Sequence, residues 1–165
     1  MSNESDSDGI GITDVDKRTG LSCIDIIEHV PFNIGIAMGN LWRCGLRCTR
    51  GEHHDLQLVK ASIWRVEREL ARCKADADQP QERMWIPKRL EGKREGLVMY
   101  FPHWVAGPFN SLWSASFYDP SDRVRGDYLP VVEELDTALF LLQKSASMLT
   151  ARAWTEAKVE TKNGT

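Results

Sequence analysis

Cationic side chains surround the junction between two predicted helices. Arg43, Arg47 and Arg50 follow one another closely along the chain, and Lys60 stands just beyond them. A guanidinium group offers paired N–H donors that suit phosphate oxygens, and the start of a helix adds partial positive charge. The pattern therefore predicts a phosphate-binding site formed by Arg43, Arg47 and Lys60. The alternative is that these cations are solvated charges at the ends of helices.

Three carboxylates are candidates for holding Mg²⁺ beside such a site. Asp25 and Glu28 share one helix face at i, i+3, and Asp55 stands where the second helix of the junction begins. Proteins bind Mg²⁺ through one or two carboxylates together with substrate phosphates, so Asp25, Glu28 or Asp55 would be the ligand. In the structural alternative these acids face water, and Asp25 or Glu28 holds Arg43 in an ion pair between helices.

Two tryptophans are candidates for contact with a nucleobase. Trp42 directly precedes Arg43, and Trp64 lies one turn beyond Lys60. An indole ring can stack on a base or wall its pocket. The chain contains no G-x-x-x-x-G-K-[ST] segment, so a nucleotide would be held without the usual phosphate loop.

Cysteine and histidine side chains are also concentrated here. Cys44, Cys48, His53 and His54 carry the ligand atoms of a zinc site. Their spacing matches no common zinc finger or ribbon, and a buried small hydrophobic residue explains Cys44 well. We therefore do not expect zinc.

Apolar spacing predicts the helices that position these residues. A short helix over residues 22–30 ends at Pro31, and a second helix follows with Asn33 as its cap. The third helix carries an apolar seam at intervals of three and four residues, formed by Leu56, Val59, Ile63, Val66, Leu70 and Cys73. The second and third helices are predicted to form an antiparallel hairpin, with Arg65 and Glu69 paired on its outer side.

The rest of the chain changes character after a polar linker. Residues 96–101 and 113–117 are predicted to be strands, the second because apolar residues alternate with serine. A long helix begins near Pro130 and runs to about residue 158, and its apolar spacing predicts a buried face formed by Val131, Leu135, Ala138, Leu142, Ala146, Leu149 and Ala153. The predicted fold class is mainly α, with an N-terminal helical hairpin module, a small β-hairpin-like insertion and a long C-terminal helix.

One domain accounts for most of the chain. We expect an acidic, disordered tail over residues 1–19, a single domain over 20–159 and a disordered tail over 160–165. Within the domain, residues 20–73 form the helical module, 74–129 the linker and aromatic insertion, and 130–159 the C-terminal helix.

Composition bounds the function classes. The chain has 165 residues, 42% hydrophobic and 27% charged, with a net charge of −3, which excludes wholesale disorder and a basic nucleic-acid-binding surface over the whole molecule. Nucleic acid is therefore the lesser partner. Four cysteines form no disulfide scaffold, and no signal peptide is recognised, so we expect a reducing, intracellular setting.

A charge-free stretch over residues 96–118 raises the question of a membrane span. It contains prolines and several polar residues, which argue against a lipid-facing helix, and we expect no membrane partner. Its aromatic residues are expected in the core, in a homo-oligomer interface or in a docking surface for a host protein.

Two segments, CIDIIEHVPFNIGIAMGNLWRCGLR and HHDLQLVKASIWRVEREL, resemble the SaV-like family of small bacteriophage proteins over residues 20–72. The family pattern is Ile-Asp-hydrophobic-Ile-Glu, then Phe-Asn-Leu-Gly, then aromatic-x-Arg-Ala-Gly, then a helix rich in Glu and Arg. Where the family has Asn and a Lys-Tyr pair, this chain has Ile36, Gly39 and Asn40. The matching positions are Ile24, Asp25, Ile27, Glu28, Phe32, Asn33, Gly35, Trp42, Arg43, Gly45, Arg47, Asp55, Leu56, Lys60, Ala61, Trp64, Glu67 and Arg68.

The resemblance implies a phage protein that acts in the host cytoplasm. One relative, a small nucleotide kinase of T7-type phages, phosphorylates deoxynucleoside monophosphates without a P-loop. The implied function is accessory to nucleotide metabolism: binding of a nucleotide at the helical hairpin and, with Mg²⁺, deoxynucleoside monophosphate kinase activity. The alternative is a non-catalytic interaction protein that binds a host factor through the aromatic middle segment.

Overall fold

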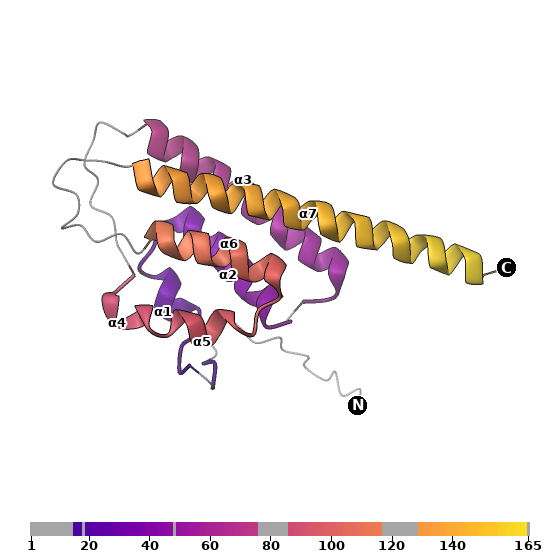
Figure 1. The fold of residues 1–165 in the computed structure, drawn as a ribbon, viewed down its shortest axis with the longest axis horizontal. Coiled ribbons are helices and arrows are strands. Elements are labelled where there is room, and N and C mark those ends of the chain that lie inside the picture. The colour runs from indigo at the N-terminus through magenta and orange to yellow at the C-terminus, as the bar shows by residue number, and fades with distance from the viewer. Residues whose placement is uncertain (1–14, 18, 48, 76–85, 117–128, 165) are drawn as a thin grey trace, which may run out of the picture.

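The computed structural model describes residues 15–17, 19–47, 49–75, 86–116 and 129–164, and this part of the chain is mainly helical (Figure 1). The predicted fold class, mainly α with a long C-terminal helix, is confirmed. In chain order the helices are α1 (Ile24–Ile27), α2 (Phe32–Gly45), α3 (Glu52–Ala75), α4 (Lys88–Glu91), α5 (Arg94–Val98), α6 (His103–Ser116) and α7 (Leu129–Asn163).

Helices α2 and α3 form the predicted antiparallel hairpin. The Asn40 side-chain amide donates to the Ser62 hydroxyl at 3.4 Å, and Arg65 donates to Asn33 Oδ1 at 3.3 Å. Later residues of α2 therefore face earlier residues of α3. The apolar seam of α3 faces inward, with Val59 and Val66 fully buried. The predicted Arg65–Glu69 pair is wrong because Glu69 points into the core instead of lying on the outer side.

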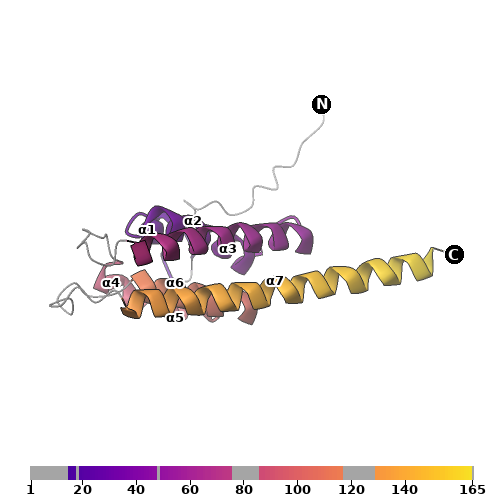
Figure 2. The same ribbon diagram turned by 90° about the horizontal axis from the view of Figure 1, so that it is seen from above.

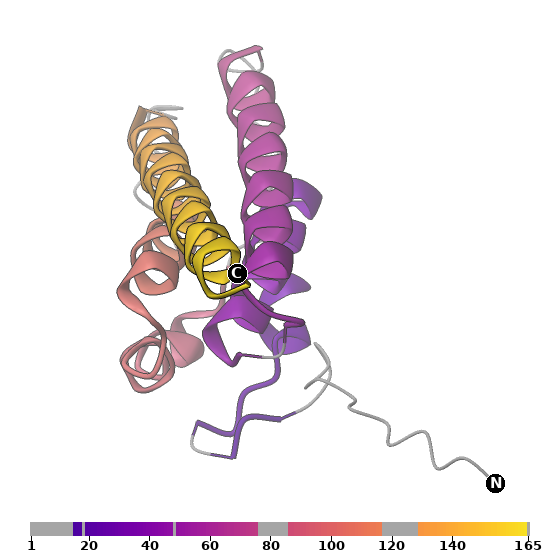
Figure 3. The same cartoon turned by 90° about the vertical axis from the view of Figure 1, so that its right-hand side faces the viewer.

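Helix α7 closes the core against α3 and α6. It lies alongside α3 and extends past it at the C-terminal end (Figures 2 and 3). Its predicted inner face is buried at Val131, Leu135, Ala138, Leu142 and Leu149. The helix continues to Asn163, through most of the residues predicted to be a tail, and its last turns are exposed.

A chain of aromatic rings fills the space between α2 and α6. Phe101 makes edge contacts with Trp42, at 6.4 Å between ring centroids, and with Phe109, at 5.3 Å. Phe109 continues to Trp113 at 6.2 Å. Three of these rings come from the charge-free segment, whose aromatic residues were expected in the core, in a homo-oligomer interface or in a docking surface, and all three are buried.

The predicted β-hairpin is wrong. Residues 96–98 belong to α5, and residues 113–116 form the end of α6. The buried residues Val105, Phe109, Leu112 and Ser116 recur at intervals of three and four, which is the helical period. The alternation at 113–116 is too short to outweigh it, and Ser116 satisfies its hydroxyl within the helix by donating to the Leu112 carbonyl at 2.9 Å.

The predicted N-terminal disordered tail, the linker over 76–85 and Phe117 lie outside the described residues, apart from residues 15–17 and 19 of the tail. Within the described part, no helix is both long enough and apolar enough to cross a membrane.

Candidate functional site

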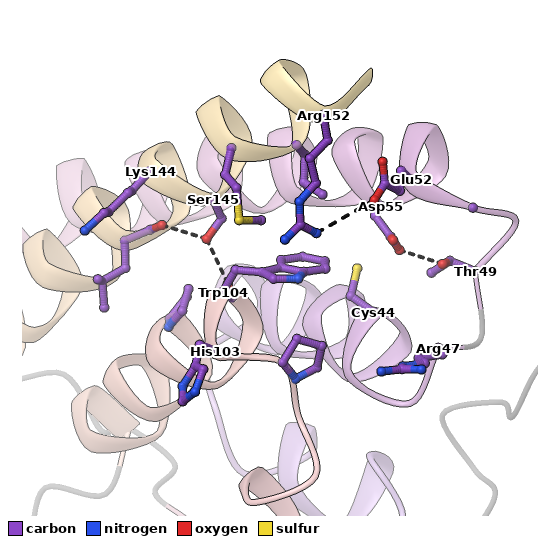
Figure 4. A pocket seen from close by; sticks show the side chains of 16 residues that line it. Cys44, Arg47, Thr49, Glu52, Asp55, His103, Trp104, Lys144, Ser145 and Arg152 are labelled. Atoms are coloured by element: carbon purple, nitrogen blue, oxygen red, sulfur yellow. Dashed lines mark hydrogen bonds and ion pairs between the residues drawn. The ribbon is translucent and has the colours of Figure 1, made fainter. Parts of the chain in front are cut away.

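The structure holds a cavity of about 930 Å³ where the end of α2 and the starts of α3 and α6 meet the middle of α7 (Figure 4). This volume lies near the upper end of the roughly 300–1,000 Å³ typical of small-molecule sites. Its lining comprises Cys44, Arg47, Thr49, Gly51, Glu52, Asp55, Pro102, His103, Trp104, Pro108, Leu141, Lys144, Ser145, Met148, Leu149 and Arg152. We call it the Trp104 cavity.

Trp104 is held at the centre of the lining by a contact between helices. Pro108 lies inside α6 and has no N–H to give to the Trp104 carbonyl one turn earlier. The Ser145 hydroxyl on α7 donates to that carbonyl at 2.8 Å (Figure 4). The first turn of α6 is therefore fixed by α7, and this turn carries the indole into the cavity.

Carboxylates from the first turn of α3 occupy one end of the cavity. Glu52 Oε1 lies 3.7 Å from Nη1 of Arg152, while Glu52 Oε2 is buried and has no hydrogen-bond partner among the residues that the structure describes. Asp55, one turn further on the same face, accepts a hydrogen bond from the Thr49 hydroxyl at 2.5 Å. Acids at this position are favoured by the helix dipole of α3.

Basic side chains border the same space from three segments. Arg47 follows α2 with a left-handed backbone (φ 57°), which turns the chain toward α3. Lys144 and Arg152 lie two turns apart on α7, and His103 begins α6. In Figure 4 the Arg152 side chain points toward the Trp104 ring. The cavity thus combines an apolar wall with cations at its rim, the arrangement that suits an anionic ligand with a flat body.

The Cys44 thiol at the cavity wall stays protonated. Burial raises its pKa, and the nearby Asp55 carboxylate, which accepts its hydrogen bond, raises the pKa further. A nucleophilic or metal-binding cysteine needs the thiolate, so Cys44 acts here as a small apolar residue.

The other candidate zinc ligands are engaged locally. His54 Nδ1 accepts the Arg50 backbone N–H at 3.0 Å, and His53 lies 3.2 Å from the Gln57 amide nitrogen. Cys48 lies outside the described residues. Among described residues, no three His, Cys, Asp or Glu side chains are placed to hold a metal ion.

The predicted phosphate-binding residues are divided between different surfaces. Arg47 and Asp55 line the Trp104 cavity. Arg43 lies in a separate groove of about 300 Å³, together with the positions Ile36, Gly39 and Asn40. Lys60 is exposed on α3 and lines neither space.

The two predicted base-stacking tryptophans have different surroundings. Trp42 is completely buried beneath Phe101, so it offers no face to a base. Trp64 is 49% exposed on the outer side of α3 and lines neither the cavity nor the groove. The indole that does line the cavity, Trp104, was not predicted.

The three predicted magnesium ligands are not brought together. Asp25 accepts hydrogen bonds from the Ser22 hydroxyl at 2.7 Å and from the Ser22 backbone N–H at 2.8 Å. Glu28 is exposed, and its nearest partner is His29 at 3.3 Å. Neither acid pairs with Arg43 within the described part of the chain, so the predicted ion pair between helices is not formed.

Sequence reasoning missed the residues that α6 and α7 contribute. Lys144, Ser145, Met148 and Arg152 fall on one face of α7, at i, i+1, i+4 and i+8. That spacing could have flagged a polar stripe beside the buried face. Nothing local connects it with Trp104, because the contact depends on how α6 and α7 pack.

Comparison with protein-family models, with curated proteins and with solved structures finds no match to this chain.

Proposed function

We propose that the chain is a SaV-like phage protein of nucleotide metabolism and that it binds a deoxynucleoside monophosphate in the Trp104 cavity. One observation supports this most directly: Arg47, Lys144 and Arg152 border a cavity of about 930 Å³ whose wall includes an indole ring. A guanidinium group can donate two parallel N–H bonds to phosphate oxygens, and an indole ring stacks on the face of a base. The cations come from α7 as well as from the hairpin, so the proposed site is larger than the hairpin alone.

In this proposal the phosphate lies toward Arg47 and Arg152. Arg152 then exchanges part of its contact with Glu52 for the phosphate, because at 3.7 Å that ion pair is loose. The base lies against Trp104, whose position is fixed by the bond from Ser145. Cys44 and Leu149 complete the apolar wall.

Phosphoryl transfer is the reaction that the family resemblance implies. The γ-phosphoryl group of a nucleoside triphosphate would pass to the monophosphate and give two diphosphates. Glu52 and Asp55 would supply the protein ligands of a magnesium site. Two carboxylates are enough, since Mg²⁺ is usually bound by one or two carboxylates together with substrate phosphates. Glu52 Oε2 would be the ligand atom, because this buried oxygen has no hydrogen-bond partner among the described residues. When bound, Mg²⁺ would neutralise developing charge on the phosphates.

A thermal-shift panel tests binding before any reaction is assumed. Deoxynucleoside monophosphates, with and without Mg²⁺, should raise the melting temperature of the wild-type protein, and the corresponding nucleosides should not. Calorimetric titration then gives the affinity. Replacing Arg47 by Gln should weaken binding about tenfold or more, because a charge-assisted hydrogen bond contributes roughly 1.5–3 kcal/mol.

Arg89→Gln is the matched control. Arg89 is an exposed arginine on α4 that does not line the cavity, so its variant should bind like the wild type. Equal binding by the Arg47 and Arg89 variants, or no shift with any monophosphate at millimolar ligand, would refute the cavity as a nucleotide site. Diphosphate formation, followed by chromatography, tests the kinase step separately.

We further propose that the protein acts in the host cytoplasm and as a homo-oligomer. Large apolar side chains remain exposed on several elements, among them Ile24, Met99 and Phe140. Such residues are the usual material of contacts between subunits. Light scattering coupled to size-exclusion chromatography measures the assembly, and a monomer at micromolar concentration would contradict it.

A further inference from the structure

A second surface, on the side formed by α2 and α3, combines exposed rings with arginines. The Arg65 guanidinium lies 5.3 Å from the centroid of Phe32 and 4.8 Å from that of Trp64. Arg68 approaches Trp64 from one turn further along α3, also at 4.8 Å. Two rings and two guanidinium groups therefore alternate along the surface. We call these four residues the arginine–aromatic face.

Burial does not explain why these rings are there. Phe32 is 72% exposed and Trp64 is 49% exposed, although both lie beside a well-packed hairpin. The Cζ atoms of both arginines lie over the Trp64 ring, and Arg65 is further held by its hydrogen bond to Asn33 Oδ1 at 3.3 Å. A guanidinium group carries several N–H donors that suit an oxyanion, so the face offers such donors beside exposed rings.

The face continues into the groove on α2. Phe32 lies at one end of this groove of about 300 Å³ and Arg43 lines it further along α2. Gly35, Ile36, Gly39 and Asn40 line it between these two residues, so the groove follows α2 from Phe32 to Arg43.

Charge on this surface favours a polyanion. Lys60 stands one turn before Trp64 on α3 and is exposed, which adds a fourth cation to Arg43, Arg65 and Arg68. The exposed acids on the same elements are Glu67 and Glu28, and Glu28 lies beside His29 at 3.3 Å. The local balance is positive although the net charge of the chain is −3.

We propose that the arginine–aromatic face and the adjoining groove bind single-stranded nucleic acid. The arginines contact phosphodiester oxygens, while the exposed rings of Phe32 and Trp64 stack with unpaired bases. A duplex keeps its bases stacked inside, so it would contact the cationic side chains but not the two rings. An acidic peptide would likewise contact only the cationic side chains. The exposure of the two rings is what favours a single strand.

Fluorescence anisotropy with a labelled oligothymidine of about twelve nucleotides tests the proposal. Binding should weaken about 20-fold between about 50 and 200 mM salt if three phosphates are contacted. Trp64→Ala should weaken binding about fivefold or more, Trp64→Phe should restore most of it, and Arg68→Gln should lower the salt slope by about 0.7.

The matched control is Trp154→Ala, which removes an exposed indole from the far end of α7. It should leave oligonucleotide affinity unchanged. Arg47→Gln, in the Trp104 cavity, should also leave it unchanged, so this proposal and the nucleotide site fail independently. The proposal would be overturned if the Trp64 and Trp154 variants lost oligonucleotide affinity equally. It would also be overturned if a duplex bound as tightly as the single strand, or if an oligoglutamate of matched charge competed as well as unlabelled oligothymidine. No binding at low salt would overturn it as well.

Discussion

The hydroxyl of Ser145 on α7 donates a hydrogen bond to the backbone carbonyl of Trp104 on α6, at 2.8 Å. In an uninterrupted helix this carbonyl would accept the N–H of the residue four positions later, but that residue is Pro108. The same hydroxyl lies 2.9 Å from the Leu141 carbonyl in its own helix, so its single proton is shared. Helix α7 therefore supplies the donor that the proline lacks.

Replacing Ser145 by Ala should lower the free energy of unfolding by about 1–2 kcal/mol, because a buried carbonyl loses its partner. Pro108→Ala restores an N–H to that carbonyl. In the Pro108→Ala background the cost of Ser145→Ala should therefore fall to a few tenths of a kcal/mol. Urea unfolding of the four proteins in this double-mutant cycle gives the coupling energy.

Ser147→Ala is the control for this cycle. Ser147 is exposed on α7 and donates to the Gln143 carbonyl of its own helix, at 3.0 Å. Its replacement should change stability by less than about 0.5 kcal/mol in either background. If the changes in free energy of unfolding caused by Ser145→Ala and Pro108→Ala simply add in the double variant, Ser145 does not compensate for the proline.

The close approach of α2 to Phe101 gives a second prediction. A Cβ added to Gly45 would lie 2.5 Å from Cδ1 of Phe101, whose ring is fixed by contacts with Trp42 and Phe109. Gly45→Ala should therefore destabilise the protein by about 1–3 kcal/mol through overpacking. Chemical denaturation measures the loss.

Gly92→Ala provides the comparison for Gly45→Ala. A Cβ at Gly92 meets nothing within 4 Å, and its φ of −65° suits any residue. This variant should be neutral or slightly stabilising. If both glycine variants behave alike, the ring of Phe101 has room to move and the packing argument is wrong.

Periodicity predicted the elements whose residues make regular contacts. The seam of α3 and the inner face of α7 were predicted because burial there repeats every three or four residues. The sequence alone gives no reason for a glycine at residue 45, and the structure supplies one in the Phe101 ring. The segment around α6 was misread because five residues of alternation were given more weight than the longer helical spacing.

The candidate site was predictable only where one stretch of chain supplies it. Arg47 and Asp55 flank a single loop, and both line the Trp104 cavity. Trp104 and Arg152 come from helices whose contact is set by packing across the core, so no local pattern joins them. Trp42 was assigned to the site for a related reason. A tryptophan beside an arginine suggests a binding residue, and only the structure shows that Phe101 packs against it.

Glu69 gives a third prediction because it is a charge inside the core. Its side chain is 1% exposed and is held by Arg72 through Nε at 3.1 Å and Nη2 at 2.5 Å. Arg72→Leu should cost about 3–5 kcal/mol, since it removes the cation from a buried carboxylate. Replacing both residues by Leu should recover most of that loss.

The exposed Glu67 is the control for Glu69. Glu67→Ala on the same helix should change the free energy of unfolding by less than about 0.5 kcal/mol. A double Leu variant as unstable as Arg72→Leu alone would mean that the pair is needed for more than mutual neutralisation.

Ser22 and Asp25 make the stability of the first turn depend on pH. The Ser22 hydroxyl, followed by the Ser22 backbone N–H, lowers the pKa of the Asp25 carboxyl below its usual value near 4. A lowered pKa stabilises the fold above the unfolded-state value, and that contribution is lost as the pH falls through the folded-state value. Ser22→Ala removes the larger cause, so it should destabilise the protein at pH 7 and have a smaller effect at about pH 2. Unfolding curves of the wild type and the variant across this range measure the difference, with Asp25→Asn as the reference for an uncharged side chain. A difference that stays constant down to the acid end would show that the Ser22 hydroxyl acts without regard to the charge of Asp25.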